Sequence, residues 1–246
     1  MSDSLLLDVQ GISKYFGGLQ ANEDISFQVQ TEEIVSIIGP NGAGKSTLFS
    51  CVTGFHRVEK GRVLFKGHDV TNRKPHTIAR LGIVRTFQIV QVISDMTVLE
   101  NVMTGGFLRR TRVDHVRRKA EEILAFTGLM EKRSYNALEL TISDKKRLEV
   151  SMALAMDPEL LMLDESMAGL TPVELRQIIE LIRKVRASSV TVVVVEHVME
   201  AVMELSDRVI VLNSGRKIME GTPKEVVANP EVKRAYLGER YSALGQ

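Results

Sequence analysis

A glycine-rich loop follows an apolar strand-like segment and constrains the fold more than any other part of the sequence. Residues 34–38 are apolar except for one serine. The next nine residues follow the pattern G-x-x-x-x-G-K-S-T and are Gly39, Pro40, Asn41, Gly42, Ala43, Gly44, Lys45, Ser46 and Thr47. A strand that enters such a loop and continues as a helix directs backbone N–H groups and a helix N-terminus at one point. The sequence therefore predicts an α/β fold with a phosphate site.

The residues of this loop differ in their expected roles. Gly42 and Gly44 let the backbone approach a phosphate closely. Lys45 would reach the β- and γ-phosphates of a nucleotide, and the Ser46 hydroxyl would help to hold Mg²⁺. An ordinary strand-to-helix turn is the alternative, but it does not require a lysine and a hydroxyl directly after the glycines.

Composition limits the classes of protein to consider. The chain has 246 residues, 44% of them apolar, which suits one large α/β domain or a core with one inserted subdomain. A net charge of +1 gives no basic footprint for nucleic acid. No apolar run approaches the ~20 residues that cross a bilayer, and Met1–Ser4 lacks the basic region of a signal peptide. We expect a soluble chain that can lie against a membrane protein, with its single cysteine, Cys51, buried.

Acidic residues end an apolar segment in the second half of the chain. Residues 160–163 are all apolar, as in a strand buried on both faces of a parallel sheet, and Asp164 and Glu165 follow. At the end of such a strand Asp164 would bind Mg²⁺, and Glu165 would orient or deprotonate an attacking water. A helix N-terminus is the alternative explanation of an Asp-Glu pair.

Two further predicted strands end in polar residues. Residues 83–88 form a strand that ends at Gln88, and residues 190–195 form one that is followed by Glu196 and His197. Ligand-binding groups of open α/β sheets lie at such carboxyl ends. Considered singly, a glutamine is more often a surface residue, and a histidine is more often structural.

The remaining segments complete the predicted organisation. Strands are expected at residues 5–12, 25–29, 61–67 and 209–212, with helices starting at the capping boxes 171–174 and 222–225. Between residues 91 and 155 helix-forming residues with basic groups predominate, so we expect an inserted helical subdomain there. Residues 1–90 and 156–246 would form the α/β core and a β subdomain within one domain.

Five elements in this order resemble the nucleotide-binding subunit of an ABC transporter, over essentially the whole chain. They are the phosphate loop, Gln88 as the Q-loop, Asp164 with Glu165 as the Walker B pair, residues 168–171 as the D-loop, and His197 as the switch histidine. The resemblance implies a P-loop NTPase fold with a RecA-like core, an antiparallel β subdomain and a helical subdomain. It also implies an ATP hydrolase with ATP and Mg²⁺ as cofactors.

The resemblance also implies roles for single residues. Lys45, Glu165, His197 and Gln88 would be catalytic, and Mg²⁺ would be held by Ser46, Gln88 and Asp164. Phe16 would stack on adenine, with Tyr15 as the neighbouring candidate, although a surface turn beside a core phenylalanine explains the same letters equally well.

Several stretches resemble the ATPase subunits of branched-chain amino acid importers. They are residues 14–19, 84–88, 96–102 and 232–239. The implied partners are a second ATPase subunit, transmembrane permease subunits and, indirectly, a periplasmic or extracellular solute-binding protein, at the cytoplasmic face of the inner (plasma) membrane. Urea, amides or lipopolysaccharide remain alternative cargoes, and an ABC ATPase outside transport remains an alternative class.

One stretch departs from the family pattern. The family signature L-S-G-G-Q falls on residues 140–144, where Thr141 keeps a hydroxyl but Ser143 and Asp144 replace glycine and glutamine. In the family this signature contacts the nucleotide of the other subunit. A carboxylate ~4 Å from a phosphate would cost about 1 to 4 kcal/mol. Alternatively, Asp144 faces away and stabilises the helix N-terminus. We predict an asymmetric heterodimer, with a homodimer as the alternative.

Overall fold

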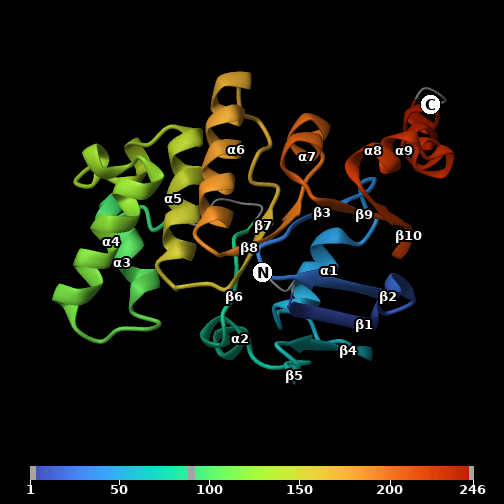
Figure 1. The fold of residues 1–246 in the computed structure, drawn as a ribbon, viewed down its shortest axis with the longest axis horizontal. Coiled ribbons are helices and arrows are strands. Elements are labelled where there is room, and N and C mark those ends of the chain that lie inside the picture. The colour runs from blue at the N-terminus through green and yellow to red at the C-terminus, as the bar shows by residue number, and fades with distance from the viewer. Residues whose placement is uncertain (1–3, 88–91, 244–246) are drawn as a thin grey trace.

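The protein is described here by a computed structural model that covers residues 4–87 and 92–243. Figure 1 shows two sheets with helices on either side of the larger one, and a group of helices at one end of the molecule. The fold is that of a P-loop NTPase, as the sequence predicts.

The larger sheet has six strands in the order β10-β9-β3-β8-β7-β6. The strands are β3 (Ile34–Ile38), β6 (Ile83–Arg85), β7 (Leu160–Asp164), β8 (Thr191–Val195), β9 (Arg208–Asn213) and β10 (Arg216–Gly221). All neighbours pair in parallel except β10, which runs antiparallel to β9. Every residue of β3, β7 and β8 is buried, which explains their unbroken apolar sequences.

The smaller sheet is antiparallel and has the order β2-β1-β4-β5. Its strands are β1 (Leu5–Phe16), β2 (Leu19–Gln30), β4 (Lys60–Phe65) and β5 (His68–Asp69). Helix α1 (Lys45–Val52) packs between the two sheets, because its buried Leu48 and Phe49 share one apolar cluster with both. Helix α2 (Pro75–Leu81) leads into β6.

Four helices follow the later strands of the core. They are α6 (Pro172–Ala187), α7 (Met199–Leu205), α8 (Pro223–Ala228) and α9 (Pro230–Ala243). The two predicted capping boxes are confirmed: Thr171 with Glu174 begins α6, and Thr222 with Glu225 begins α8. In each box the hydroxyl and the carboxylate satisfy backbone N–H groups that the helix itself leaves unpaired.

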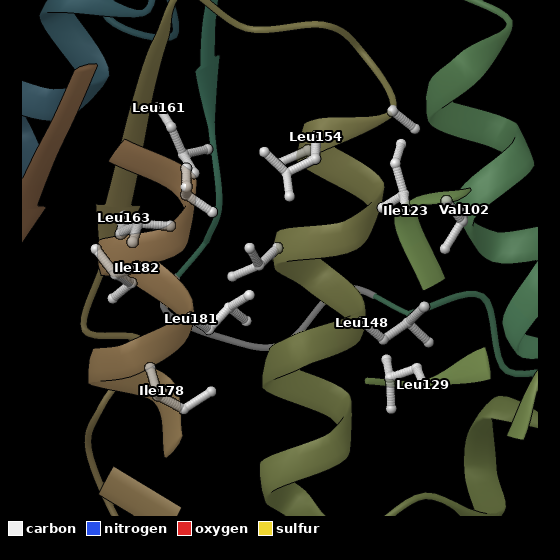
Figure 2. Close-up of a cluster of buried hydrophobic side chains, with 14 of the residues drawn as sticks. Val102, Ile123, Leu129, Leu148, Leu154, Leu161, Leu163, Ile178, Leu181 and Ile182 are labelled. Atoms are coloured by element: carbon white, nitrogen blue, oxygen red, sulfur yellow. The ribbon is translucent and has the colours of Figure 1, made fainter. Parts of the chain in front are cut away.

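Three helices lie between β6 and β7 in the sequence and gather at the left of Figure 1. They are α3 (Val98–Gly106), α4 (Val113–Thr127) and α5 (Ile142–Leu154), with short 3-10 turns at Met130–Lys132 and Ala137–Glu139. Figure 2 shows how side chains from α4, α5, α6 and β7 form one continuous apolar cluster. The helices are therefore packed onto the α/β core rather than loosely tethered to it.

Two strand predictions need correction. The strand that we expected to continue to Gln88 ends at Arg85, although Thr86 N still donates to Met162 O at 2.9 Å; Gln88 lies outside the described residues. Strand β10 was missed, because Arg216–Gly221 is a mostly polar edge strand without alternation of apolar residues. Both errors concern the two edges of the larger sheet.

Two smaller expectations concern single features. Cys51 is buried, and burial raises the pKa of its thiol to about 11, so it behaves as a small apolar residue. None of the helices within residues 4–87 and 92–243 is both long enough and apolar enough to span a bilayer.

The apolar cluster in Figure 2 predicts a large cost for truncating Leu148, which is fully buried on α5. We expect Leu148→Ala to lower the free energy of unfolding by about 2 to 5 kcal/mol, because it leaves a cavity among packed side chains. Urea unfolding followed by circular dichroism measures this. The same change at Leu138, which is 61% exposed, is the control and should cost well under half as much. Equal losses for the two variants would contradict the packing described here.

Candidate nucleotide site

The glycine-rich loop joins the carboxyl end of β3 to the start of α1. Gly39 has φ +155° and Gly44 has φ +95°, and a Cβ at either position would collide with backbone. It would lie 2.1 Å from Leu212 O at Gly39 and 2.3 Å from Ala21 O at Gly44. The loop therefore needs glycine at these two positions because β9 and β2 pass so close to it.

The loop lysine is folded onto its own loop. Lys45 is 7% exposed, and its Nζ donates to Gly39 O at 2.6 Å and to Pro40 O at 2.9 Å. Asn22, which is fully buried on β2, donates to Gly44 O at 3.1 Å and fixes the other end of the loop. The ammonium group is thus held against the carbonyl oxygens of Gly39 and Pro40 within the loop.

Asp164 at the end of β7 is almost completely buried and paired with Arg85. Arg85 Nη2 donates to Asp164 Oδ2 at 2.6 Å, and Arg85 Nη1 donates to Ser50 Oγ at 2.8 Å. Burial raises the pKa of Asp164, and the hydrogen bond and charge of Arg85 oppose that rise. The guanidinium also lies over three aromatic rings, those of Phe49, Phe55 and Phe87. Arg85 therefore fixes one carboxylate oxygen of Asp164, Oδ2, and does not contact the other, Oδ1.

The second carboxylate oxygen of Asp164 decides whether this site could bind Mg²⁺. Asp164 Oδ1 is buried and has no hydrogen-bond partner within the described residues. No group of three or more His, Cys, Asp or Glu side chains among those residues is arranged to hold a metal ion. Mg²⁺ is commonly bound by one or two carboxylates together with substrate phosphates and water. The free oxygen of Asp164 therefore fits a Mg²⁺ ion that would arrive with a nucleotide, and the part of Ser46 in holding it stays a prediction.

Strand register brings the predicted catalytic residues together. Ile37 on β3 and Asp164 on β7 both pair with Val195 on the β8 strand between them. Because parallel strands present their carboxyl ends at one edge, the loop, Glu165 and His197 emerge side by side. Glu165 is half-buried with φ +51°, and His197 is exposed. The arrangement places Lys45, the Glu165 carboxylate and the His197 imidazole at one edge of the sheet.

Two predicted site residues are less well placed or not described. Gln88 lies outside the described residues, directly after Phe87. The Phe16 ring is 43% exposed and packs against His56, with ring centroids 5.2 Å apart, while Lys14 Nζ lies 4.9 Å from its centre. The alternative of a surface turn beside a core phenylalanine is right about the exposed turn at Gly17 and Gly18 and wrong about the phenylalanine. Adenine stacking stays a prediction.

The altered signature begins α5, apart from the phosphate loop in Figure 1. Asp144 is 7% exposed, and its carboxylate pairs with Lys132 and accepts from the Thr141 hydroxyl at 3.0 Å. Thr141 in turn caps the helix by accepting from Asp144 N at 3.2 Å. This geometry favours the alternative in which Asp144 stabilises the helix N-terminus. The Thr141 hydroxyl hydrogen is engaged within its own chain, and Ser143 is buried.

Three charged residues near the site were not predicted from the sequence to have a role there. They are Arg85, whose side chain is 8% exposed, and the buried Lys146 and Glu196. Arg85 and Glu196 directly follow apolar segments, which was the available signal for them, whereas Lys146 lies in a polar run that gave no such signal. Which partner each one neutralises depends on contacts over long sequence separations, such as the 79 residues between Arg85 and Asp164. Sequence alone does not reveal such pairings.

Together the fold and the site define a P-loop ATPase, and comparisons with known proteins give its family. A family profile described as "ABC transporter" matches residues 22–168, and one described as "Branched-chain amino acid ATP-binding cassette transporter" matches residues 216–242. The chain belongs to the ABC transporter family and is an ABC-type ATP hydrolase.

Two curated relatives match over nearly their whole length. The chain is 41% identical to the high-affinity branched-chain amino acid transport ATP-binding protein LivG of Escherichia coli strain K12, over 95% of this chain and 98% of that protein. It is 37% identical to the corresponding protein BraF of Pseudomonas aeruginosa, with the same coverage.

Solved structures agree with this assignment. The chain resembles a nucleotide-free ATP-binding cassette from an ABC transporter with a TM-score of 0.88, 32% identity and coverage of 95% of this chain and 99% of that one. It also resembles the ADP conformation of an ABC transporter cassette, with a TM-score of 0.88, 33% identity and coverage of 96% and 99%.

Glu196 predicts a pH dependence of stability. It is 1% exposed, and burial raises its pKa from the usual 4.5 to about 7, opposed mainly by hydrogen bonds from backbone N–H groups and by Lys146. The folded state therefore keeps a proton that the unfolded state releases, so stability falls as pH rises from about 4.5 to about 7. Compared with Glu196→Gln, the wild type should lose up to about 1.4 kcal/mol per pH unit in this window.

Urea midpoints at pH 5 and pH 7.5 measure the difference. Glu200→Gln removes an exposed carboxylate from α7 and is the control, which should follow the wild type. Parallel curves for wild type and Glu196→Gln would show that Glu196 ionises normally in the folded protein.

Proposed function

We propose that this chain is the ATP-hydrolysing subunit of an importer for branched-chain or related amino acids, and that it drives transmembrane permease subunits from the cytoplasmic face of the membrane. The proposed ATP hydrolysis is supported by one observation: the loop, Asp164, Glu165 and His197 converge on one edge of the sheet. The cargo rests on similarity to LivG and BraF, because the cargo itself would not touch this subunit. A solute-binding protein would deliver the cargo to the permease on the other side.

The residues of the site divide the work of phosphoryl transfer. The loop amides and Lys45 would neutralise charge on the β- and γ-phosphates. Ser46 and Asp164 would hold a Mg²⁺ ion, which would supply positive charge to the phosphates. Gln88 stays a predicted further ligand. Phe16 would support the adenine ring.

Hydrolysis itself needs a base and a water. Glu165 would accept a proton from the attacking water while its oxygen bonds to the γ-phosphorus and the bond from that phosphorus to the ADP oxygen breaks. His197 would hydrogen-bond the γ-phosphate and so report whether it is present. ATP binding would close two subunits on each other, and release of phosphate would let them reopen.

The role of Glu165 gives the first test of this function. Glu165→Gln should lower the ATPase kcat of the assembled transporter at least about 100-fold, because it removes the general base. Binding of ATP should remain, as measured with a fluorescent ATP analogue. Glu200→Gln is the charge-matched control and should keep full activity. Undiminished turnover in Glu165→Gln would refute the proposed role of this glutamate.

The altered signature supports a partner with a different sequence. Two copies of this chain would place the Thr141–Asp144 hydrogen bond at both nucleotides, so at neither one would the Thr141 hydroxyl hydrogen be free for the γ-phosphate. A second type of ATPase subunit with an unaltered signature would complete the nucleotide site of this chain, and the reciprocal site would be weaker. We propose such a heterodimer. Sedimentation of Glu165→Gln with ATP and Mg²⁺, alone and with ATPase subunits of the same transporter, tests it, and an ATP-dependent homodimer would refute it.

Restoring the signature should strengthen the weaker site. We expect Ser143→Gly with Asp144→Gln to raise turnover of the heterodimer roughly ten-fold, which corresponds to about 1.4 kcal/mol and lies at the low end of the Coulomb range because Lys132 already compensates Asp144. Steady-state ATPase assays of the reconstituted transporter measure it. Asp114→Asn removes one carboxylate from α4 and should change nothing. Unchanged turnover in the double variant would mean that the altered signature does not limit hydrolysis.

A further inference from the structure

The backbone directly after the Walker B strand is held in an unusual conformation. Glu165 has φ +51°, a left-handed value that costs strain in a residue with a side chain. The strain is maintained only if surrounding groups fix the turn. Glu165 N donates to Val195 O at 2.9 Å, which ties the turn to β8. Two buried charged side chains supply the rest.

The first is Lys146 from α5, the helix that begins with the altered signature. It is 8% exposed, and its Nζ donates to Ala168 O at 2.6 Å and to Glu165 O at 3.3 Å. One ammonium group thus bridges the two ends of the segment 165–168. Because α5 lies outside the sheet, this contact links the signature helix to the Walker B strand of the same chain.

The second is Glu196, the residue before His197. Its Oε1 accepts a hydrogen bond from Met167 N at 2.8 Å, in the middle of the same segment. Its Oε2 is buried without a hydrogen-bond partner within the described residues. The segment is therefore held by an ammonium group at two of its carbonyl groups and by a carboxyl oxygen at one of its N–H groups.

The charges around this segment compensate one another. Burial lowers the pKa of Lys146, and the carboxylates of Glu196, Glu149 and Glu165 oppose that shift. Burial likewise raises the pKa of Glu196, and Lys146 opposes it while Glu165 adds to it. Buried charges of this kind contribute little net stability, so their presence calls for a reason other than holding the fold together.

We propose that Lys146 and Glu196 are positioning residues that fix the backbone of residues 165–168 and so aim the Glu165 carboxylate at the attacking water. Through Lys146 the signature helix of the chain is coupled to its own hydrolytic glutamate. This inference rests on the proposed role of Glu165 as general base.

The test uses the full chain in its assembled transporter. Lys146→Met removes all three donors and keeps the length of the side chain, whereas Lys146→Arg can still donate to both carbonyl groups. We expect Lys146→Met to lower the ATPase kcat at least about ten-fold with KM for ATP within about two-fold, and Lys146→Arg to recover most of that loss. Lys184→Met, an exposed lysine on α6, is the matched control and should behave as wild type.

Glu196 offers a second, independent pair of variants. Glu196→Gln keeps an acceptor for Met167 N–H and should retain most of kcat. Glu196→Met removes the acceptor and should lose kcat as Lys146→Met does, again without a change in KM. Amide hydrogen exchange of a peptide that spans residues 163–170 should be faster in both methionine variants and unchanged in Lys184→Met.

The outcomes separate the inference from the proposed function. If Glu165→Gln hydrolyses ATP normally, the role of Glu165 fails and the inference fails with it. If Glu165→Gln is inactive but Lys146→Met and Glu196→Met keep kcat and the exchange of residues 163–170, the positioning role alone is refuted. If the methionine variants lose ATP affinity and kcat together, with faster exchange throughout the chain, the two residues are merely structural, and the inference is equally refuted.

Discussion

The parallel pairing of β3, β8 and β7 is the constraint on which the rest of the structure depends. These three strands are buried on both faces, so their register is fixed by packing against α1 on one side and α6 on the other. Their carboxyl ends then lie at one edge, where the chain has to turn. The strand register alone therefore brings together the groups that follow these strands, which are the phosphate loop, the Asp-Glu pair and the histidine.

Buried charge is the second organising feature, and it serves the site more than the stability of the fold. Arg85 holds one oxygen of Asp164, while Lys146 and Glu196 hold the turn that follows it. Such groups lose hydration when they are buried, and their mutual attraction rarely exceeds that loss. They do restrict geometry, because a buried charge tolerates few arrangements of its partners. This explains why polar residues concentrate at the end of an otherwise apolar sheet.

At the start of α5, hydrogen bonds that cap the helix within one chain compete with a contact that the family signature makes to the other subunit. Thr141 and Asp144 form a reciprocal cap, and Lys132 compensates the carboxylate, so the helix end is well satisfied within one chain. The same hydrogen bonds use the hydroxyl that the family signature offers to a neighbouring subunit. This conflict is the physical basis of the heterodimer that we propose.

The sequence alone was enough to predict the loop, the two capping boxes and the apolar strands, because each depends on residues close together in the chain. It also predicted that Asp164, Glu165 and His197 follow buried strands, and their meeting follows from the parallel sheet. The edge strands were less predictable, since β10 has no apolar alternation and β6 ends early.

Only the tertiary structure decided which buried charges pair. The pair Arg85 and Asp164 joins residues 79 positions apart. The contacts of Lys146 with the carbonyl groups of Glu165 and Ala168 span 19 and 22 positions. It also decided that Asp144 faces Lys132 and that Phe16 is exposed. The physical reason is that a charge or a ring finds its neighbour through packing of whole elements, and local sequence patterns carry no information about that packing.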